Sequence, residues 1–267
     1  IPFCEVLVQT LGFDWVLLFL QTHLHTSTVI LGMRILLVLG CAPSLVQRFR
    51  EGSSNGGWLT DVEFHLAHNK MSVLASPQVS KSRDLRHEAL TVPGFQHLAW
   101  LLPAHIRIQQ MYFLLIALLM GQPVKHLPAE SKLELELDNI WDFVFGMPVE
   151  HSFSKVSKCI TICQEAISVL LRMVRSIMNG IQEDKCLEGH PITLIQFLFI
   201  LYHNMSSDFM PVFITPDVLS SLVSTLFPFS ESVSLTEHPA NKFVMDFLRS
   251  IVVDSLSLPV TSKSSPI

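Results

Sequence analysis

The sequence PAHIRIQQMYFLLIALLMGQP, residues 103–123, decides the fold class because a helix formed by its central part would have no polar face. Every residue from 111 to 120 is apolar or aromatic, and a proline stands at each end of the stretch. A helix that is apolar all round belongs in a protein core or in a membrane, and a membrane span needs about 20 such residues. The run is shorter than that. It therefore predicts a buried core helix, with Gly121 as its left-handed C-terminal cap.

The composition indicates a large core with apolar faces left over. Of the 267 residues, 49% are hydrophobic and only 15% are charged, with a mean hydropathy of +0.43. An ordinary soluble domain carries about 25% charged residues. We therefore expect a piece of a larger protein whose apolar faces meet neighbouring segments. A membrane protein is the alternative, but no uncharged apolar run reaches about 18 residues, since Glu5, Asp14 and Arg34 interrupt the nearest candidates.

Several simple functions are disfavoured by charge and cysteine content. The net charge is −5 and the basic residues are scattered, which argues against a nucleic-acid-binding surface. The chain begins at Ile1 with no signal-peptide pattern, so we expect an internal fragment or a truncated isoform. An odd number of cysteines, mostly in apolar or helical contexts, predicts reduced thiols in a cytoplasmic protein rather than a disulfide framework. The cysteines are Cys4, Cys41, Cys159, Cys163 and Cys186.

Hydrophobic periodicity and helix-end signals predict an all-α protein. Glycines 40, 146 and 180 would end helices, and prolines 43 and 216 would stand in first turns. The expected N-terminal caps are Ser27, Thr60 with Glu63, Asp138, Ser152 or Ser154, and Thr215. The expected helices are residues 2–20, 26–40, 43–51, 60–74, 95–102, 103–123, 138–145, 152–179, 191–204, 216–227 and 239–256.

Two stretches carry more specific predictions. In residues 2–20, an apolar stripe at three- and four-residue steps predicts one continuous amphipathic helix. The stretch KLELELD, residues 132–138, alternates as a strand does, but a single strand among helices has no partner. We expect an extended linker there. The stripe of the first helix consists of Phe3, Leu7, Leu11, Trp15 and Leu18.

Successive helices with broad apolar faces and short loops predict an irregular armadillo- or HEAT-like solenoid. No sequence period proves a repeat, so an irregular globular helical bundle remains the alternative. We expect one helical region over residues 1–267, divisible into 1–75 and 93–258. A polar surface loop at 76–92 would separate these parts, and 259–267 would form a polar tail.

The histidines invite a search for metal sites. Asp61, His65 and His68 fall on one helical face at ligand-like spacing, but zinc needs further ligands and no HExxH motif is present. His23 and His25 would face different sides of a helix. Solvated helix faces explain these residues more simply, so no metal site is predicted.

No signature of an enzyme is present. The glycines form neither a dinucleotide-binding motif nor a phosphate-binding loop, and the serines form no nucleophile elbow. Cys159 and Cys163, one helical turn apart, favour a structural pair. Asp246 and Asp254 share a helix face and could do acid–base work, but a solvated face is the simpler interpretation. We therefore predict no catalytic, cofactor-binding or metal-binding residues; an enzyme or small-molecule carrier with a pocket between helices is the alternative.

Two aromatic-x-x-aliphatic cores near acids, at Trp15 and Trp141, match peptides that add a strand to ubiquitin-like autophagy modifiers. That mode needs an exposed, extended peptide. Both tryptophans fall in predicted helices whose aromatic residues should be buried, which weakens this interpretation.

Several short phrases are spread along nearly the whole chain: GGWL (56–59), PGF (93–95), YFLL (112–115), DNIWDFVFG (138–146), PITL (191–194), YHN (202–204), FPF (227–229) and HPANKFVMDFLRSIVVDSLSL (238–258). In this order they resemble the BEACH-domain scaffold family of WD-repeat and FYVE-domain-containing proteins. They are structural signatures rather than catalytic ones. Only eight residues separate Phe229 from His238, which resembles the shorter, leukocyte-type branch rather than the autophagy-linked branch with its longer insertion.

This resemblance implies an armadillo-like part of a very large cytoplasmic scaffold that acts in selective autophagy and endosomal vesicle traffic. The leukocyte-type branch implies a role in immune cells, in the handling of antigen. Family members carry PH-like, BEACH, WD-repeat and FYVE modules downstream, and these modules would supply the membrane association. The segment in hand would then bind other proteins and the rest of its own long chain, without binding nucleic acid or inserting into membranes.

Overall fold

The computed structural model describes residues 2–51, 94–122, 126–129, 132–146, 162–180, 187–204, 210–226 and 239–257. Within these ranges every regular element is a helix, so the all-α prediction is confirmed. The helices are α1 (Pro2–Leu11), α2 (Asp14–Leu18), α3 (Thr26–Leu39), α4 (Pro43–Glu51), α6 (Gly94–Leu101), the 3₁₀ helix η2 (Leu102–His105), α7 (Gln109–Leu119), α8 (Leu137–Phe145), α9 (Gln164–Gly180), α10 (His190–Asn204), α11 (Met210–Phe213), α12 (Pro216–Thr225) and α13 (Pro239–Ser257).

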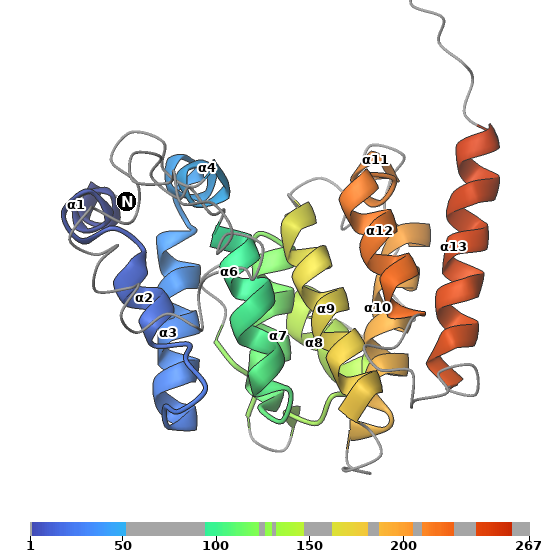
Figure 1. The fold of residues 1–267 in the computed structure, drawn as a ribbon, viewed down its shortest axis with the longest axis horizontal. Helices are drawn as coiled ribbons and strands as arrows, with labels where there is room; N and C mark the ends of the chain where they lie inside the picture. Colours follow the sequence, from blue (N-terminus) through green and yellow to red (C-terminus); the bar gives the residue numbers. More distant parts are fainter. Residues whose placement is uncertain are drawn as a thin grey trace, which may run out of the picture.

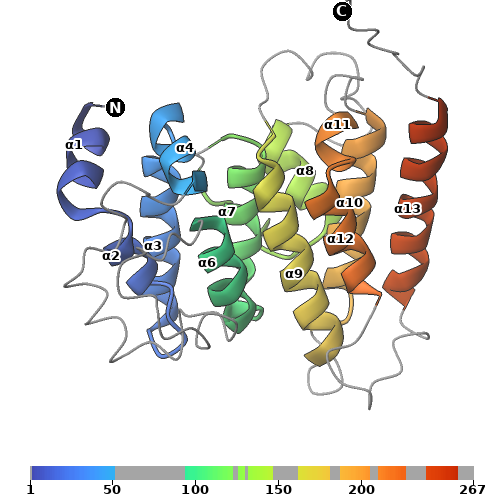
Figure 2. The same cartoon turned by 45° about the horizontal axis from the view of Figure 1, so that its top comes forward.

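The helices follow one another along the long axis of the molecule in nearly the order of the chain. Figure 1 shows α1 at one end and α13 at the other, with α7, α8 and α10 lying behind α6, α9 and α12. Figure 2 shows the same serial order after rotation. The central helix of the row is α9, which packs against α6, α7, α10 and α12. Each helix therefore contacts near neighbours along the row rather than one common centre.

The apolar stretch that decides the fold class forms the buried helix α7, as predicted. Residues 111–120 are all buried. Gly121 takes a positive φ of 61°, and its N–H donates to Leu118 O at 3.1 Å, while the next N–H donates to Ala117 O at 2.8 Å. This is the predicted left-handed cap, in the Schellman form. The helix starts later than expected, at Gln109, because the chain from 102 to 105 forms η2.

The prediction of one helix over residues 2–20 is wrong. Gly12 takes a φ of 72° and separates α1 from α2. Phe3 and Leu11 of α1 and Leu18 of α2 are exposed, while Phe13 and Val16 lie in the core. The apolar stripe seen in the sequence is therefore not the buried face.

Several helix ends also differ from expectation. His25, not Ser27, caps α3, because its Nδ1 accepts the Ser27 N–H at 3.3 Å. Glu136, not Asp138, precedes α8, and no side chain caps that end. Gly40 and Gly146 stand directly after α3 and α8 as predicted, and Pro43 begins α4.

The remaining sequence predictions are partly outside the described residues. The helix expected over 152–179 begins at Gln164 in its described part, and residues 133–136 hold no regular structure, in keeping with a linker. The short helices η2 and α11 were not predicted. The capping pair Thr60 and Glu63, the expected loop at 76–92 and the tail at 259–267 lie outside the described residues.

Taken singly, none of the described helices is both long and apolar enough to cross a membrane. Residues 26–39 and 43–50 meet the length and composition test only as a pair, and that pair is bent by 115°.

Candidate functional site

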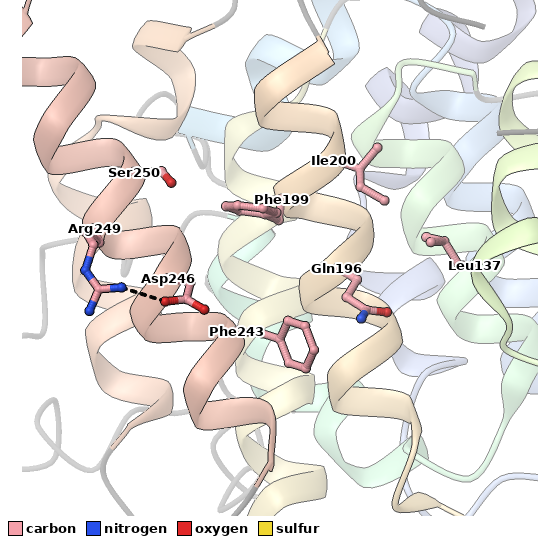
Figure 3. Close-up of a pocket in the computed structure, with 8 residues that line it drawn as sticks. All are labelled: Leu137, Gln196, Phe199, Ile200, Phe243, Asp246, Arg249 and Ser250. Atoms are coloured by element: carbon pink, nitrogen blue, oxygen red, sulfur yellow. Dashed lines mark hydrogen bonds and ion pairs between the residues drawn. The ribbon is translucent and has the colours of Figure 1, made fainter. Parts of the chain in front are cut away.

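A groove of about 570 Å³ lies between α10 and α13, with the start of α8 at one edge (Figure 3). Its apolar residues come from all three helices, and polar side chains stand along the α13 wall. None of the lining residues is fully buried, so the groove is open to solvent along its length. It is lined by Leu137, Gln196, Phe199, Ile200, Phe243, Asp246, Arg249 and Ser250.

The groove exists because the two helices bury one face and leave the adjacent face half covered. On α13 the buried positions recur every three or four residues, which is the core face of an amphipathic helix. Phe243 and Ser250 lie next to that face and remain half-buried, as Phe199 and Ile200 do on α10. The buried positions on α13 are Ala240, Val244, Phe247 and Ile251.

Specific contacts hold the two groove helices side by side. The ring of Phe199 lies edge-on to Phe247 with centroids 5.6 Å apart, and Tyr202 lies 5.4 Å from the same ring. The Tyr202 hydroxyl donates to Asp254 Oδ2 at 2.8 Å. Burial, together with this acceptor, raises the pKa of Tyr202 above its ordinary value, so the hydroxyl stays protonated as a donor. The walls of the groove are thus fixed by core packing and one polar contact.

Charge is distributed unevenly around the groove. On the α13 wall, Arg249 Nη1 donates to Asp246 Oδ1 at 2.8 Å, so that wall carries a neutral pair. At the α8 edge, Leu137 stands between Glu136 and Asp138, and both acids are exposed. Neither acid is among the residues that line the groove, and the charged side chains of the lining are the Asp246–Arg249 pair.

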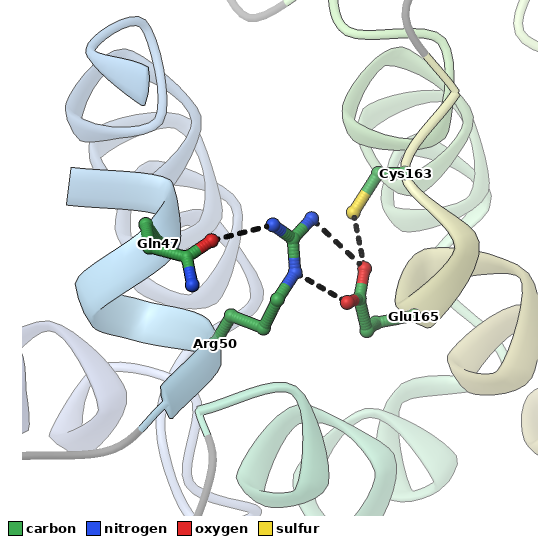
Figure 4. A network of polar contacts seen from close by, with 4 residues as sticks. All are labelled: Gln47, Arg50, Cys163 and Glu165. Atoms are coloured by element: carbon green, nitrogen blue, oxygen red, sulfur yellow. Dashed lines mark hydrogen bonds and ion pairs between the residues drawn. The ribbon is translucent and has the colours of Figure 1, made fainter. Parts of the chain in front are cut away.

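A second polar cluster joins the first helices of the row to the middle (Figure 4). Arg50 of α4 binds Glu165 of α9 with two parallel contacts, through Nε to Oε1 and through Nη2 to Oε2, the latter at 3.2 Å. Arg50 Nη1 also donates to Gln47 Oε1 at 3.0 Å, and the Cys163 thiol donates to Glu165 Oε2 at 3.3 Å. Bidentate pairing of this kind fixes orientation as well as charge.

This cluster is structural rather than reactive. Burial, with the nearby Glu165 carboxylate, raises the pKa of Cys163 to about 12. A thiol must ionise to act as a nucleophile or metal ligand. Cys163 therefore stays protonated near neutral pH, and the cluster serves as a clamp between α4 and α9.

Those sequence candidates for chemistry that lie in the described part of the chain are not brought together. Asp246 pairs with Arg249 at the groove, whereas Asp254 accepts from Tyr202, so the two carboxylates have separate partners. Among the described residues, no group of three or more histidine, cysteine or acidic side chains is placed to hold a metal ion. Asp61, His65, His68, Cys159 and Cys186 lie outside the described residues.

The two tryptophan motifs are helical in the structure. Trp15 lies in α2, half-buried, and its Nε1–H donates to Gly12 O at 3.0 Å. Trp141 lies in α8 and is buried, 4.4 Å from Phe145 and 6.2 Å from Phe197 between ring centroids. Strand addition through either motif would require its helix to unfold.

Apart from Asp246, the groove residues were not identified by sequence reasoning. The signal that could have found them is the half-buried flank next to each core stripe, such as Phe199 and Ile200 beside Leu198. That signal shows a helix face with incomplete burial. It does not show that α10 and α13 pack together, because periodicity within one helix carries no information about which other helix lies beside it.

Proteins similar to this chain include one from human and one from mouse. It is 27% identical over 228 residues to the human protein called WD repeat- and FYVE domain-containing protein 4, and 27% identical over 228 residues to the mouse protein of the same name. The aligned part is 84% of this chain in both cases. The predicted resemblance to the WD-repeat and FYVE-domain-containing family is confirmed. Both relatives carry the number four in their names.

The WD-repeat and FYVE-domain resemblance covers only a small part of those relatives. The chain spans 7% of the length of each. No family model matches the chain, and no solved structure matches it.

Proposed function

We propose that this chain is a non-catalytic, armadillo-like scaffold segment of a large BEACH-family protein, and that it binds other proteins through its helical surfaces. The observation that carries the proposal is the open groove formed jointly by α8, α10 and α13 in a serial row of helices. Rows of helices that contact mainly near neighbours present extended surfaces of this kind to protein partners. The family resemblance supports the same role.

The finer role follows from the family. The full protein would act in selective autophagy and endosomal vesicle traffic, with antigen handling in immune cells as the special task of its branch. It would lie in the cytoplasm at the periphery of endosomal or autophagic membranes, through modules other than this one. Within the segment, residues 1–267 would form one helical region, with 1–75 and 93–258 as its parts.

A small-molecule carrier or enzyme is the second candidate, because a volume of 570 Å³ lies in the range of ligand pockets. Such pockets usually enclose most of the ligand surface. Here every lining residue keeps some exposure to solvent. The site also lacks convergent titratable groups, since Asp246 is paired with Arg249. The open shape of the groove and the pairing of Asp246 with Arg249 favour a protein as the ligand over a small molecule.

The test is a proximity-labelling comparison in cells between the full-length parent protein and a version that lacks the segment equivalent to residues 93–256. If the segment is a binding platform, specific partners disappear while the shortened protein still folds and localises. An unchanged partner list would contradict the proposal and leave the segment as a spacer.

A further inference from the structure

The first helix of the row, α1, is held in place by a small part of its surface. Among the α1 residues whose burial the structure describes, only Val8 is fully buried, while Cys4 and Leu7 are half-buried against the core. The main neighbour of α1 is α3, and Gly12 separates it from α2. The position of α1 therefore depends on few contacts, so one covalent link would change how firmly it is held.

Two free thiols stand where α1 meets the rest of the row. Cys4 lies in the first turn of α1 and Cys41 in the corner between α3 and α4, and both are half-buried. The same end of α1 is tied to α4, because the Ser44 hydroxyl donates to Glu5 Oε1 at 2.8 Å. Figures 1 and 2 both show α1 and α4 at the same edge of the molecule. The fold thus brings the start of α1 to the corner that carries Cys41.

The thiols of Cys4 and Cys41 are close enough to interact. Burial raises the pKa of Cys41, and the nearby Cys4 thiol raises it further. An electrostatic effect of this kind weakens with distance, so it agrees with the Glu5–Ser44 contact beside the two cysteines. The third described cysteine is engaged elsewhere, since the Cys163 thiol donates to Glu165 in the clamp between α4 and α9.

We propose that Cys4 and Cys41 form a redox pair, and that a small-molecule disulfide such as glutathione disulfide oxidises them to a disulfide that staples α1 to the corner between α3 and α4. One cysteine thiolate attacks the small disulfide and releases one small thiol, which leaves a mixed disulfide on the chain. The other cysteine attacks the protein sulfur of that mixed disulfide, and the second small thiol leaves. Two electrons pass from the chain to the oxidant, and the two protons end on the released thiols.

The chemistry of closure predicts a pH dependence. Each cysteine acts once as the nucleophile, whichever attacks first, so Cys41 must ionise for the disulfide to close. Because its pKa is raised, only a small fraction of Cys41 is thiolate near neutral pH. Closure should therefore be slow near neutral pH and faster at about pH 8.5. A reducing compartment keeps the pair as thiols, and a rise in small disulfides closes it.

The first test is disulfide mapping on the whole 267-residue chain. The folded chain is incubated with millimolar glutathione disulfide, remaining thiols are blocked with iodoacetamide, and the peptides are read by mass spectrometry without reduction. We expect the peptide that contains Cys4 to be linked to the peptide that contains Cys41. This link should form at least about tenfold faster in the folded chain than in urea, because folding raises the effective concentration of one thiol at the other.

Three variants locate the pair. Cys4→Ser and Cys41→Ser each leave one of the two thiols, which should stop at the mixed disulfide with glutathione. Cys163→Ser is the matched control and should leave closure unchanged, because Cys163 lies at the clamp. Circular dichroism shows whether each variant is folded. Mapping of the wild-type chain decides the question where a variant is not.

Hydrogen exchange measures what the staple does to the helix. In the oxidised chain, the amides of residues 2–11 should exchange more slowly than in the reduced chain, because the disulfide restrains opening of α1. The amides of α12, which lies far along the row, should exchange equally in both states.

Three results would overturn the proposal. In the wild-type chain, Cys4 that stays as a mixed disulfide or pairs with a cysteine other than Cys41 would show that the two thiols do not meet. Equal closure rates in the folded chain and in urea would show that the fold does not bring them together. Equal exchange of the α1 amides in the oxidised and reduced chains would show that the disulfide is no staple.

Discussion

At the residue scale, single side chains decide how closely the helices approach one another. Gly94 opens α6 directly against the ring of Phe49, which itself lies edge-on to Phe13 and Phe95 with centroids 5.0 Å away in each case. A Cβ at position 94 would overlap that ring. The glycine of the PGF phrase thus has a packing reason, because a side chain at position 94 would occupy the space of the Phe49 ring, which lies between Phe13 and Phe95.

Gly94→Ala should therefore destabilise the protein. Overpacking of a filled core costs about 1–3 kcal/mol. Urea unfolding followed by circular dichroism measures the loss. Gly189→Ala is the matched control, because a Cβ at Gly189 would meet nothing within 4 Å. Equal midpoints for Gly94→Ala and the wild type would show that Phe49 moves aside freely.

His97 gives the fold a pH dependence. Burial lowers its pKa from 6.5 to about 4. Between pH 6.5 and 4, the imidazole of His97 is therefore protonated in the unfolded chain but mostly neutral in the folded chain. The free energy of unfolding falls as the pH falls through that window. The full loss is about 3 kcal/mol at pH values below both pKa values.

His97→Gln removes this titration while keeping a polar side chain of similar size. Between pH 7.5 and 4.5, the unfolding free energy of the variant should fall less than that of the wild type. The difference between the two falls should be a large part of the loss of about 3 kcal/mol. The measurement is a urea titration at each pH. Parallel pH profiles for the two proteins would show that His97 is protonated without cost in the folded state.

At the element scale, two of the ion pairs among the described residues differ in position and in exposure. Arg50 and Glu165 connect α4 to α9 with side-chain exposures of only 38% and 20%, whereas Arg249 and Asp246 lie within α13 at 71% and 42%. Exposed pairs contribute about 0–1 kcal/mol, but a partly buried carboxylate that loses its partner costs more. The clamp should therefore affect stability far more than the groove pair.

Arg50→Met should lower the free energy of unfolding by about 1–3 kcal/mol, because Glu165 is left without its cation. Arg249→Met should change it by less than about 1 kcal/mol. Thermal unfolding compares the two variants. Adding Glu165→Gln to Arg50→Met should recover part of the loss. Similar losses of stability in Arg50→Met and Arg249→Met would contradict the role of the Arg50–Glu165 pair as a clamp between α4 and α9.

Sequence reasoning worked where one signal acted alone. The buried α7 and its Gly121 cap were predicted because an all-apolar run and a following glycine act locally, and the same holds for Gly146 after α8. It failed at residues 2–20, where Gly12 breaks the helix and the core selects Phe13 and Val16 instead of Phe3 and Leu11. The groove could not be predicted, because it depends on which helices pair.

At the scale of the whole molecule, both ends of the row expose apolar side chains. Phe3 is 74% exposed on α1, and Leu256 is 81% exposed on α13. A row of helices needs polar faces at its ends to stay soluble alone. These exposed apolar faces are of the kind that the low charge content of the sequence predicts. They include Val6 and Leu11 on α1, and Met245, Val252 and Val253 on α13.

The isolated chain should therefore self-associate at micromolar concentrations. Size-exclusion chromatography with light scattering should show a mass that rises with concentration. Val252→Lys with Leu256→Lys should reduce that rise, whereas Ser220→Lys on α12 should not. A sharply melting monomer at all concentrations would contradict this prediction.

The central claim is that the chain is a scaffold segment whose groove between α10 and α13 receives a protein partner. The most direct test is proximity labelling in cells with the full-length parent protein, carrying either Ser250→Trp in the groove or Ser220→Trp outside it. The account predicts that Ser250→Trp removes the same partners as deletion of residues 93–256, and that Ser220→Trp removes none. Partners that vanish on deletion but survive Ser250→Trp would contradict the claim.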